Sequence, residues 1–93
     1  MGNHHTPLEV LERLIGPPQV IGPIVGLHEK SPFVWRRGSK FREPGDIPGP
    51  KVQRKLLAYA RNHGIPLTAA HLIFGAPVAE IDALVAQSKV AAE

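Results

Sequence analysis

The sequence lacks cysteine altogether, which excludes disulfide bonds, thiolate metal sites and cysteine nucleophiles. Aromatic residues are scarce, with one tryptophan, one tyrosine and three phenylalanines among 93 residues. No stretch reaches the roughly 20 apolar residues of a membrane-spanning helix, and the N-terminus has no long apolar run, so we expect neither a membrane span nor a signal peptide. Hydrophobic residues nevertheless make up 43% of the chain, enough for the core of one small domain.

Acidic residues are scarce in the middle of the chain, where the cations concentrate. Between Lys30 and Arg61, nine basic residues are opposed only by Glu43 and Asp46, which gives this segment a charge of +7 in a chain of net charge +3. The two flanking segments each carry −2. A localised basic segment favours a polyanion-binding surface. A solvated basic face without a partner explains the charge equally well.

The arrangements of residues that catalysis requires are also missing. His28, His63 and His71 are scattered without the spacing of metal ligands, and Ser31 lacks convincing His and Asp partners. The glycines between residues 38 and 50 lack the strand–loop–helix context of a phosphate-binding loop. We therefore expect a protein that is not an enzyme and that uses no metal, cofactor or small-molecule substrate.

Helix signals recur along the chain. Thr6, Pro7 and Glu9 predict a capped helix start, and Gly16 predicts its end. Further helices are expected over about 18–25, from 29–32 to about 37, and over 50–62, 68–74 and 77–90. No segment alternates with period two for long enough to predict a strand, and at most a short hairpin fits within the 38–50 loop. The sequence thus predicts an all-α, single compact domain of five to six short helices.

A tight helical corner is predicted within residues 19–37. Gly22 is small enough to let two helices touch, and Gly26 with Leu27 forms the turn between them. Apolar residues flank this turn on both sides. Two helices that cross steeply in this way form a helix-turn-helix, whose second helix lies in the DNA major groove.

The segment G-L-H-E-K-S-P-F-V-W-R-R at 26–37 resembles the corner and recognition helix of small Cro-like helix-turn-helix regulators of bacteria and their phages. Gly22, Gly26 and Leu27 match its small residue, its turn glycine and the apolar residue that follows. Trp35 matches an aromatic residue that packs the recognition helix onto the domain. Residues 45–76 are similar to the loop, helix and short helix ending in Gly-Ala that follow in such proteins. The resemblance covers residues 7 to 76 and implies a lambda-repressor/Cro-like fold.

One position departs from the pattern of this family. Pro32 occupies the place where the family usually has a buried Val or Ile. We expect Phe33 or Val34 to supply the missing core contact, and Phe33 is more typical of a core residue than of a base reader. The departure bears on the rotation of the recognition helix, and so on which side chains face the bases.

The resemblance implies that base edges are read near the amino end of the recognition helix. Lys30 suits guanine O6/N7, Glu29 suits cytosine N4, and Val34 suits a thymine methyl group. For Glu29, a favourable interaction with the helix dipole is an equally good explanation. The predicted base-contacting residues are His28, Glu29, Lys30, Ser31 and Val34.

Contacts with DNA phosphates are expected from side chains that flank the recognition helix, which position the protein without reading sequence. The basic face of the 50–62 helix either extends this footprint or is an ordinary solvated face; it carries Lys51, Arg54 and Lys55. The predicted phosphate-contacting residues are Gln19, Arg36, Arg37, Lys40 and Arg42.

The C-terminal helix carries a separate hypothesis. Val78, Ile81 and Val85 recur at three-then-four spacing, which predicts a dimer seam or, with equal weight, packing of the helix on its own domain. A dimer would select DNA half-sites about 34–36 Å apart. The expected organisation is a flexible N-terminus at 1–6, a helix-turn-helix domain at 7–76 and a C-terminal helix at 77–93.

These observations predict a sequence-specific regulator of transcription that binds double-stranded DNA and acts by occupying an operator. We expect a cytoplasmic, nucleoid-associated homodimer. The rival prediction is a helical protein-interaction module whose basic face binds an acidic protein partner. DNA binding would fall steeply with salt and keep a preference for one sequence, whereas a protein partner would confer no preference among duplexes.

Overall fold

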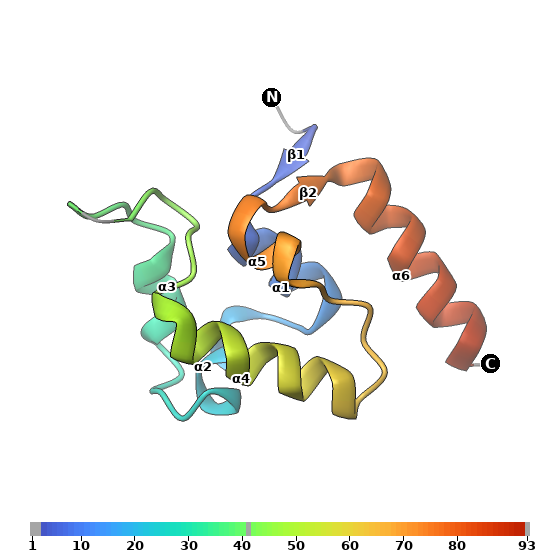
Figure 1. Ribbon diagram of the computed structural model, residues 1–93, viewed down its shortest axis with the longest axis horizontal. Coiled ribbons are helices and arrows are strands. Elements are labelled where there is room, and N and C mark those ends of the chain that lie inside the picture. Colours follow the sequence, from blue (N-terminus) through green and yellow to red (C-terminus); the bar gives the residue numbers. More distant parts are fainter. Residues whose placement is uncertain (1–2, 41, 93) are drawn as a thin grey trace.

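Helix α1 (Pro7–Leu14) lies at the centre of the molecule, where it contacts β1, α5 and α6 (Figure 1). The computed structural model describes residues 3–40 and 42–92, without the side chains of 88–92. The described chain is mostly helical, with a radius of gyration of 12.7 Å. The remaining elements are β1 (His4–His5), α2 (Pro18–Ile24), α3 (Ser31–Trp35), α4 (Gly49–Asn62), α5 (Ala69–Phe74), β2 (Ala76–Pro77) and α6 (Val78–Ala92).

The start of α1 has the capping box that the sequence predicts. The Thr6 hydroxyl accepts from the Glu9 backbone N–H at 3.3 Å, and the Thr6 backbone N–H donates to the Glu9 carboxylate at 2.8 Å. Two backbone donors that the helix itself leaves without partners are thereby satisfied. Leu8 and Leu11 then fall on one face of α1 and are fully buried, together with Val10. The three side chains make α1 the centre of the core.

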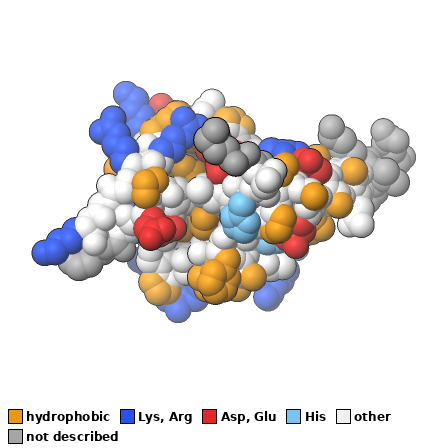
Figure 2. All heavy atoms as spheres, turned by 90° about the horizontal axis from the view of Figure 1, so that it is seen from above, with side chains coloured by type: hydrophobic (Ala, Val, Ile, Leu, Met, Phe, Trp, Pro, Cys, Tyr) orange, Lys and Arg blue, Asp and Glu red, His pale blue; other side chains and the backbone are white. Residues whose placement is uncertain are grey.

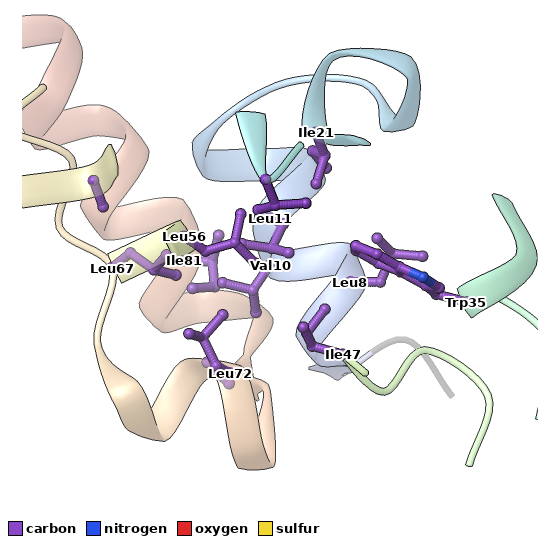
Figure 3. Packing of buried hydrophobic residues seen from close by; sticks show 13 residues of the cluster. Leu8, Val10, Leu11, Ile21, Trp35, Ile47, Leu56, Leu67, Leu72 and Ile81 are labelled. Carbon is purple, nitrogen blue, oxygen red and sulfur yellow. The ribbon is translucent and has the colours of Figure 1, made fainter. Parts of the chain in front are cut away.

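The hydrophobic core joins every helix of the described chain. Figure 3 shows Trp35 pointing from α3 toward α1, while Leu56, Leu72 and Ile81 approach α1 from the other side. Burial of this kind of apolar surface contributes roughly 25 cal/mol per Å². The buried core residues are Leu8, Val10, Leu11, Ile21, Val25, Trp35, Ile47, Leu56, Ala60, Leu67, Leu72, Ala76 and Ile81.

A two-stranded sheet departs from the prediction of a chain without strands. His4 and His5 form β1 and pair antiparallel with Pro77 and Ala76 of β2. The backbone N–H of Val78 continues the pairing by donating to the Asn3 carbonyl at 3.0 Å. Strands of two residues carry no readable alternation, so the local pattern could not reveal them. His4 and His5 of the N-terminal segment are thus paired in a strand, and Met1 and Gly2 lie outside the described residues.

The ends of α4 and α5 follow the predicted stop signals. Gly64 and Gly75 both have positive φ, at 67° and 70°, a conformation that L-residues rarely adopt. Thr68 caps α5, as its hydroxyl accepts from the His71 backbone N–H at 3.2 Å. The predicted start of the last helix was one residue early, because Pro77 lies in β2.

Helix α6 leaves the sheet and runs along the side of the molecule opposite α3 (Figure 1). Arg13 of α1 ties it to the centre through an ion pair with Asp82, with 2.7 Å between the guanidinium nitrogen and the carboxylate oxygen. Among the described residues, no helix has both the length and the apolar character needed to cross a membrane.

Candidate nucleic-acid interface

The corner between α2 and α3 depends on the smallest residue. A Cβ added to Gly22 would collide with the backbone oxygen of His28 and would lie 3.2 Å from Cδ of Pro32. The Gly22 carbonyl in turn accepts from the Leu27 backbone N–H at 2.9 Å. Gly26 has a φ of 78° and reverses the chain between the two helices. Helix α3 therefore approaches α2 more closely than any side chain at position 22 would permit.

Helix α3 has one buried face and one exposed face. Pro32 is buried, as is Trp35 one turn later, whereas Phe33 is 41% exposed and Val34 is 58% exposed. The expectation that Phe33 or Val34 replaces the missing core residue is therefore wrong, because Pro32 itself fills that place. Residues three apart share a helix face, so Pro32 and Trp35 turn Phe33 and Val34 outward. This rotation leaves Val34, a predicted base reader, on the surface.

The amino end of α3 is organised by His28. The Nδ1 atom of His28 accepts from the Lys30 backbone N–H at 3.1 Å, and the His28 carbonyl accepts from the Ser31 backbone N–H at 3.0 Å. Lys30 is the N-cap residue of α3, and its side chain makes no capping hydrogen bond. His28, Glu29 and Lys30 are exposed, and Ser31 is half-buried. The corner thus brings the predicted base readers together on one surface.

Arg36 and Arg42, both predicted phosphate contacts, have identified partners within the chain. Arg36 lies 3.3 Å from the Glu12 carboxylate and 5.3 Å from the centre of the Phe33 ring. Arg42 donates to the Asp46 carbonyl at 3.2 Å. The Arg36 side chain is half exposed. Both arginines therefore help to hold α3 and the loop after it in place.

The other predicted phosphate contacts also have exposed side chains. Gln19 lies in the first turn of α2, and Arg37 and Lys40 follow α3. Figure 2 shows Lys and Arg side chains projecting at the left of the view, on the side of α3 and the loop after it. The residues predicted to contact DNA thus come from the start of α2, the corner before α3, α3 itself and the segment that follows it.

The loop after α3 is held by backbone hydrogen bonds. The Gly45 N–H donates to the Trp35 carbonyl at 2.8 Å, and the Ser39 N–H donates to the Arg42 carbonyl at 2.7 Å. The reverse bond between the same two residues, Arg42 N–H to Ser39 oxygen, is 3.4 Å long. These bonds pair Ser39 with Arg42, in the segment where the sequence left room for a short hairpin.

Lys55 has a structural role that sequence reasoning missed. Its Nζ donates to the Val25 carbonyl at 3.3 Å and lies 3.6 Å from the position of a Cβ on Gly26. A cation at the C-terminal end of a helix interacts favourably with the helix dipole. Because α2 and α4 lie 30 residues apart in sequence, no local pattern could reveal this contact.

We expect Lys55→Met to destabilise the domain by about 1 kcal/mol, because the α2 end loses a charged donor. Lys51→Met is the matched control, since Lys51 lies exposed in the same helix, and it should change stability by less than about 0.5 kcal/mol. Urea unfolding followed by circular dichroism measures both. Equal effects of the two substitutions would contradict a specific role for Lys55.

The three residues of the predicted dimer seam differ in how deeply they are buried. Ile81 is fully buried within its own chain, whereas Val78 and Val85 are half-buried. The Ile81 side chain therefore offers no surface to a second copy, and at this position the structure matches the alternative of packing on the same domain. Dimerisation stays a prediction.

No family model, curated protein or solved structure matches this chain. Within the part of the chain that the structure describes, no group of three or more His, Asp or Glu side chains is placed to hold a metal ion.

Proposed function

We propose that the protein binds double-stranded DNA in a sequence-specific way and regulates transcription by occupying an operator. The observation that carries the proposal is the rotation of α3, where buried Pro32 and Trp35 leave Val34 and the amino end of the helix exposed. The close contact at Gly22 supports a helix-turn-helix arrangement of α2 and α3. A lambda-repressor/Cro-like domain is the architecture that these features favour.

Recognition of bases would fall to side chains at the amino end of α3. Lys30 would donate to guanine O6 or N7 in the major groove, and Val34 would contact a thymine methyl group. His28 already uses Nδ1 to hold the Lys30 backbone, so its role would be to present Lys30 as much as to touch DNA. Glu29 would accept from cytosine N4.

Contacts with the phosphate backbone would set the register of the complex. Arg37 is exposed directly after α3, and Lys40 lies in the loop beyond it. Arg36 would exchange the Glu12 carboxylate for a phosphate, an exchange of one anionic oxygen for another. Because exposed ion pairs are worth little, this exchange costs at most about 1 kcal/mol.

Selection of bound duplexes from a random pool, repeated at two salt concentrations, tests the proposal. We expect enrichment of one motif, with affinity that falls steeply as salt rises because bound phosphates release counterions. A symmetric motif would report a homodimer. Binding without any enriched motif would contradict sequence-specific recognition and would favour an acidic protein partner for the same basic face.

Two substitutions separate base reading from phosphate contact. We expect Lys30→Ala to change the preferred base at one position, with a loss of about tenfold on the selected site. Arg37→Ala should weaken all duplexes alike and reduce the magnitude of the salt slope by about 1. Fluorescence anisotropy on the selected duplex and on a scrambled duplex measures both. Parent-like binding by both variants would refute the placement of α3 in the groove.

A further inference from the structure

A largely apolar cavity of about 660 Å³ opens between α5, β2 and α6. Its walls include Leu67, Ala70, Ala76 and Leu84, and its rim carries Phe74. Phe74 is 72% exposed, the largest exposure among the large hydrophobic side chains of the described residues. The volume lies within the range of roughly 300–1,000 Å³ that is typical of small-molecule sites. DNA binding uses none of these residues.

Backbone from several segments forms part of the cavity wall. Gly75 lies at its edge with a φ of 70°, and a Cβ there would collide with the backbone oxygen of His5. Pro66 and Pro77 form two further parts of the wall. The His4 ring nitrogen Nε2 lies 2.8 Å from the Phe74 carbonyl and joins the N-terminal strand to the end of α5. Residues distant in sequence therefore line this cavity together.

The carboxylate of Glu80 lies at the wall of this cavity and is held there by His71. The Thr68 backbone N–H donates to Nδ1 of His71 at 3.1 Å, so that nitrogen carries a lone pair and the ring proton lies on Nε2. Nε2 then donates to the Glu80 carboxylate at 2.8 Å. His71 is buried, whereas the Glu80 side chain is half exposed. A neutral histidine thus holds the carboxylate at the wall of the cavity without cancelling its charge.

We propose that this cavity binds a small amphipathic molecule that has an apolar body and a cationic amine. The apolar walls accept the body, and the Glu80 carboxylate pairs with the ammonium group. The aromatic ring of Phe74, at the same rim, adds a surface that attracts cations. Neutral or acidic molecules of the same shape lack a partner for Glu80.

The site is independent of the proposed DNA interface. Figure 1 places α3 and α6 on opposite sides of the molecule, and Figure 2 shows histidine side chains among hydrophobic ones away from the projecting cations at the left. A ligand in the cavity therefore does not compete with DNA for the same surface. Binding of a small molecule is measured without DNA. A protein that binds no small molecule can therefore be distinguished from a protein that does not recognise DNA.

Titration with three matched probes tests the proposal: 4-phenylbutylamine, 4-phenylbutanol and 4-phenylbutyrate. Amide resonances of ¹⁵N-labelled protein report the site, and those of Ala70, Phe74 and Leu84 are expected to shift. The amine should bind about fivefold more tightly than the alcohol, because one half-exposed ion pair adds about that much affinity. The acid should bind more weakly than the alcohol. Absence of shifts at the solubility limit, or equal binding of the three probes, would overturn the proposal.

Two variants assign the interaction to its residues. Glu80→Gln keeps an acceptor for His71 but removes the charge, so binding of the amine should fall to the level of the alcohol while the alcohol itself binds as before. Phe74→Ala should weaken all three probes, because it removes apolar surface at the rim. Far-ultraviolet circular dichroism confirms that each variant is folded. Unchanged binding of the amine by folded Glu80→Gln would refute the role of the carboxylate.

Discussion

Gly22→Ala is expected to destabilise the domain by about 3 kcal/mol and to abolish the DNA binding that we propose. The added Cβ would overlap the backbone oxygen of His28, which cannot move aside as a flexible side chain would. Helix α3 would have to move away from α2, and buried Pro32 would lose its packing. Stability is measured by urea unfolding, and DNA binding by anisotropy on the selected duplex.

Gly16→Ala is the matched control for this substitution. A Cβ at Gly16 meets only Val20, at the ordinary contact distance of 3.9 Å. We therefore expect a change of less than about 0.5 kcal/mol and parent-like DNA binding. If Gly22→Ala were as stable as Gly16→Ala and bound the duplex normally, the close approach of α2 and α3 would not exist in solution.

Gly75→Ala should be still more damaging, with a loss of about 4 kcal/mol that combines backbone strain with overpacking. Gly75 has φ 70° and ψ −152°, a combination that is essentially restricted to glycine. A Cβ would also collide with the His5 carbonyl and separate β1 from β2. Thermal and urea unfolding measure the loss, and a retained domain should show altered amide shifts at His5 and Ala76.

Gly64→Ala separates the effect of backbone strain at positive φ from the effect of a steric collision of the added Cβ. Gly64 also has positive φ, at 67°, but a Cβ there meets nothing within 4 Å. This variant should therefore lose only about 1 kcal/mol, the cost of left-handed backbone for an L-residue. Equal losses at Gly64 and Gly75 would show that strain alone acts, and that the contact between Gly75 and the N-terminal strand contributes nothing.

Local signals in the sequence sufficed for most helix boundaries, because caps and stops act over one turn. Thr6 with Glu9 starts α1, Thr68 starts α5, and Gly64 with Gly75 ends α4 and α5. Each of these effects involves residues within a few positions of one another. The sequence-based account of the helices therefore agrees closely with the structure.

The rotation of α3 was harder to predict, because it depends on what each side chain meets. Pro32 appeared unsuited to the core by comparison with the Cro-like pattern, which usually has Val or Ile there. The tight approach at Gly22 leaves a space that the ring of Pro32 fills, 3.2 Å from the position of a Cβ. Phe33 and Val34 are consequently exposed. Only the relative position of two helices decides this outcome.

The small sheet, the Lys55 contact and the cavity all join segments that lie far apart in the chain. His5 meets Ala76, and Lys55 meets Val25. His71 and Glu80 are closer in sequence, but they lie on two helices whose separation is set by β2. No periodicity or spacing rule extends over such pairs, so their positions follow from the packing of whole elements.

The amino-acid sequence by itself determined a helical chain, the places where its helices begin and end, and the concentration of positive charge in its middle. Those properties depend on local hydrogen bonding, on backbone freedom and on composition. Only the tertiary structure decided which side of α3 is exposed to solvent. It also decided that β1 pairs with β2, and that the Glu80 carboxylate lies at the wall of an apolar cavity. These depend on distances between elements, which arise when the shared core is packed.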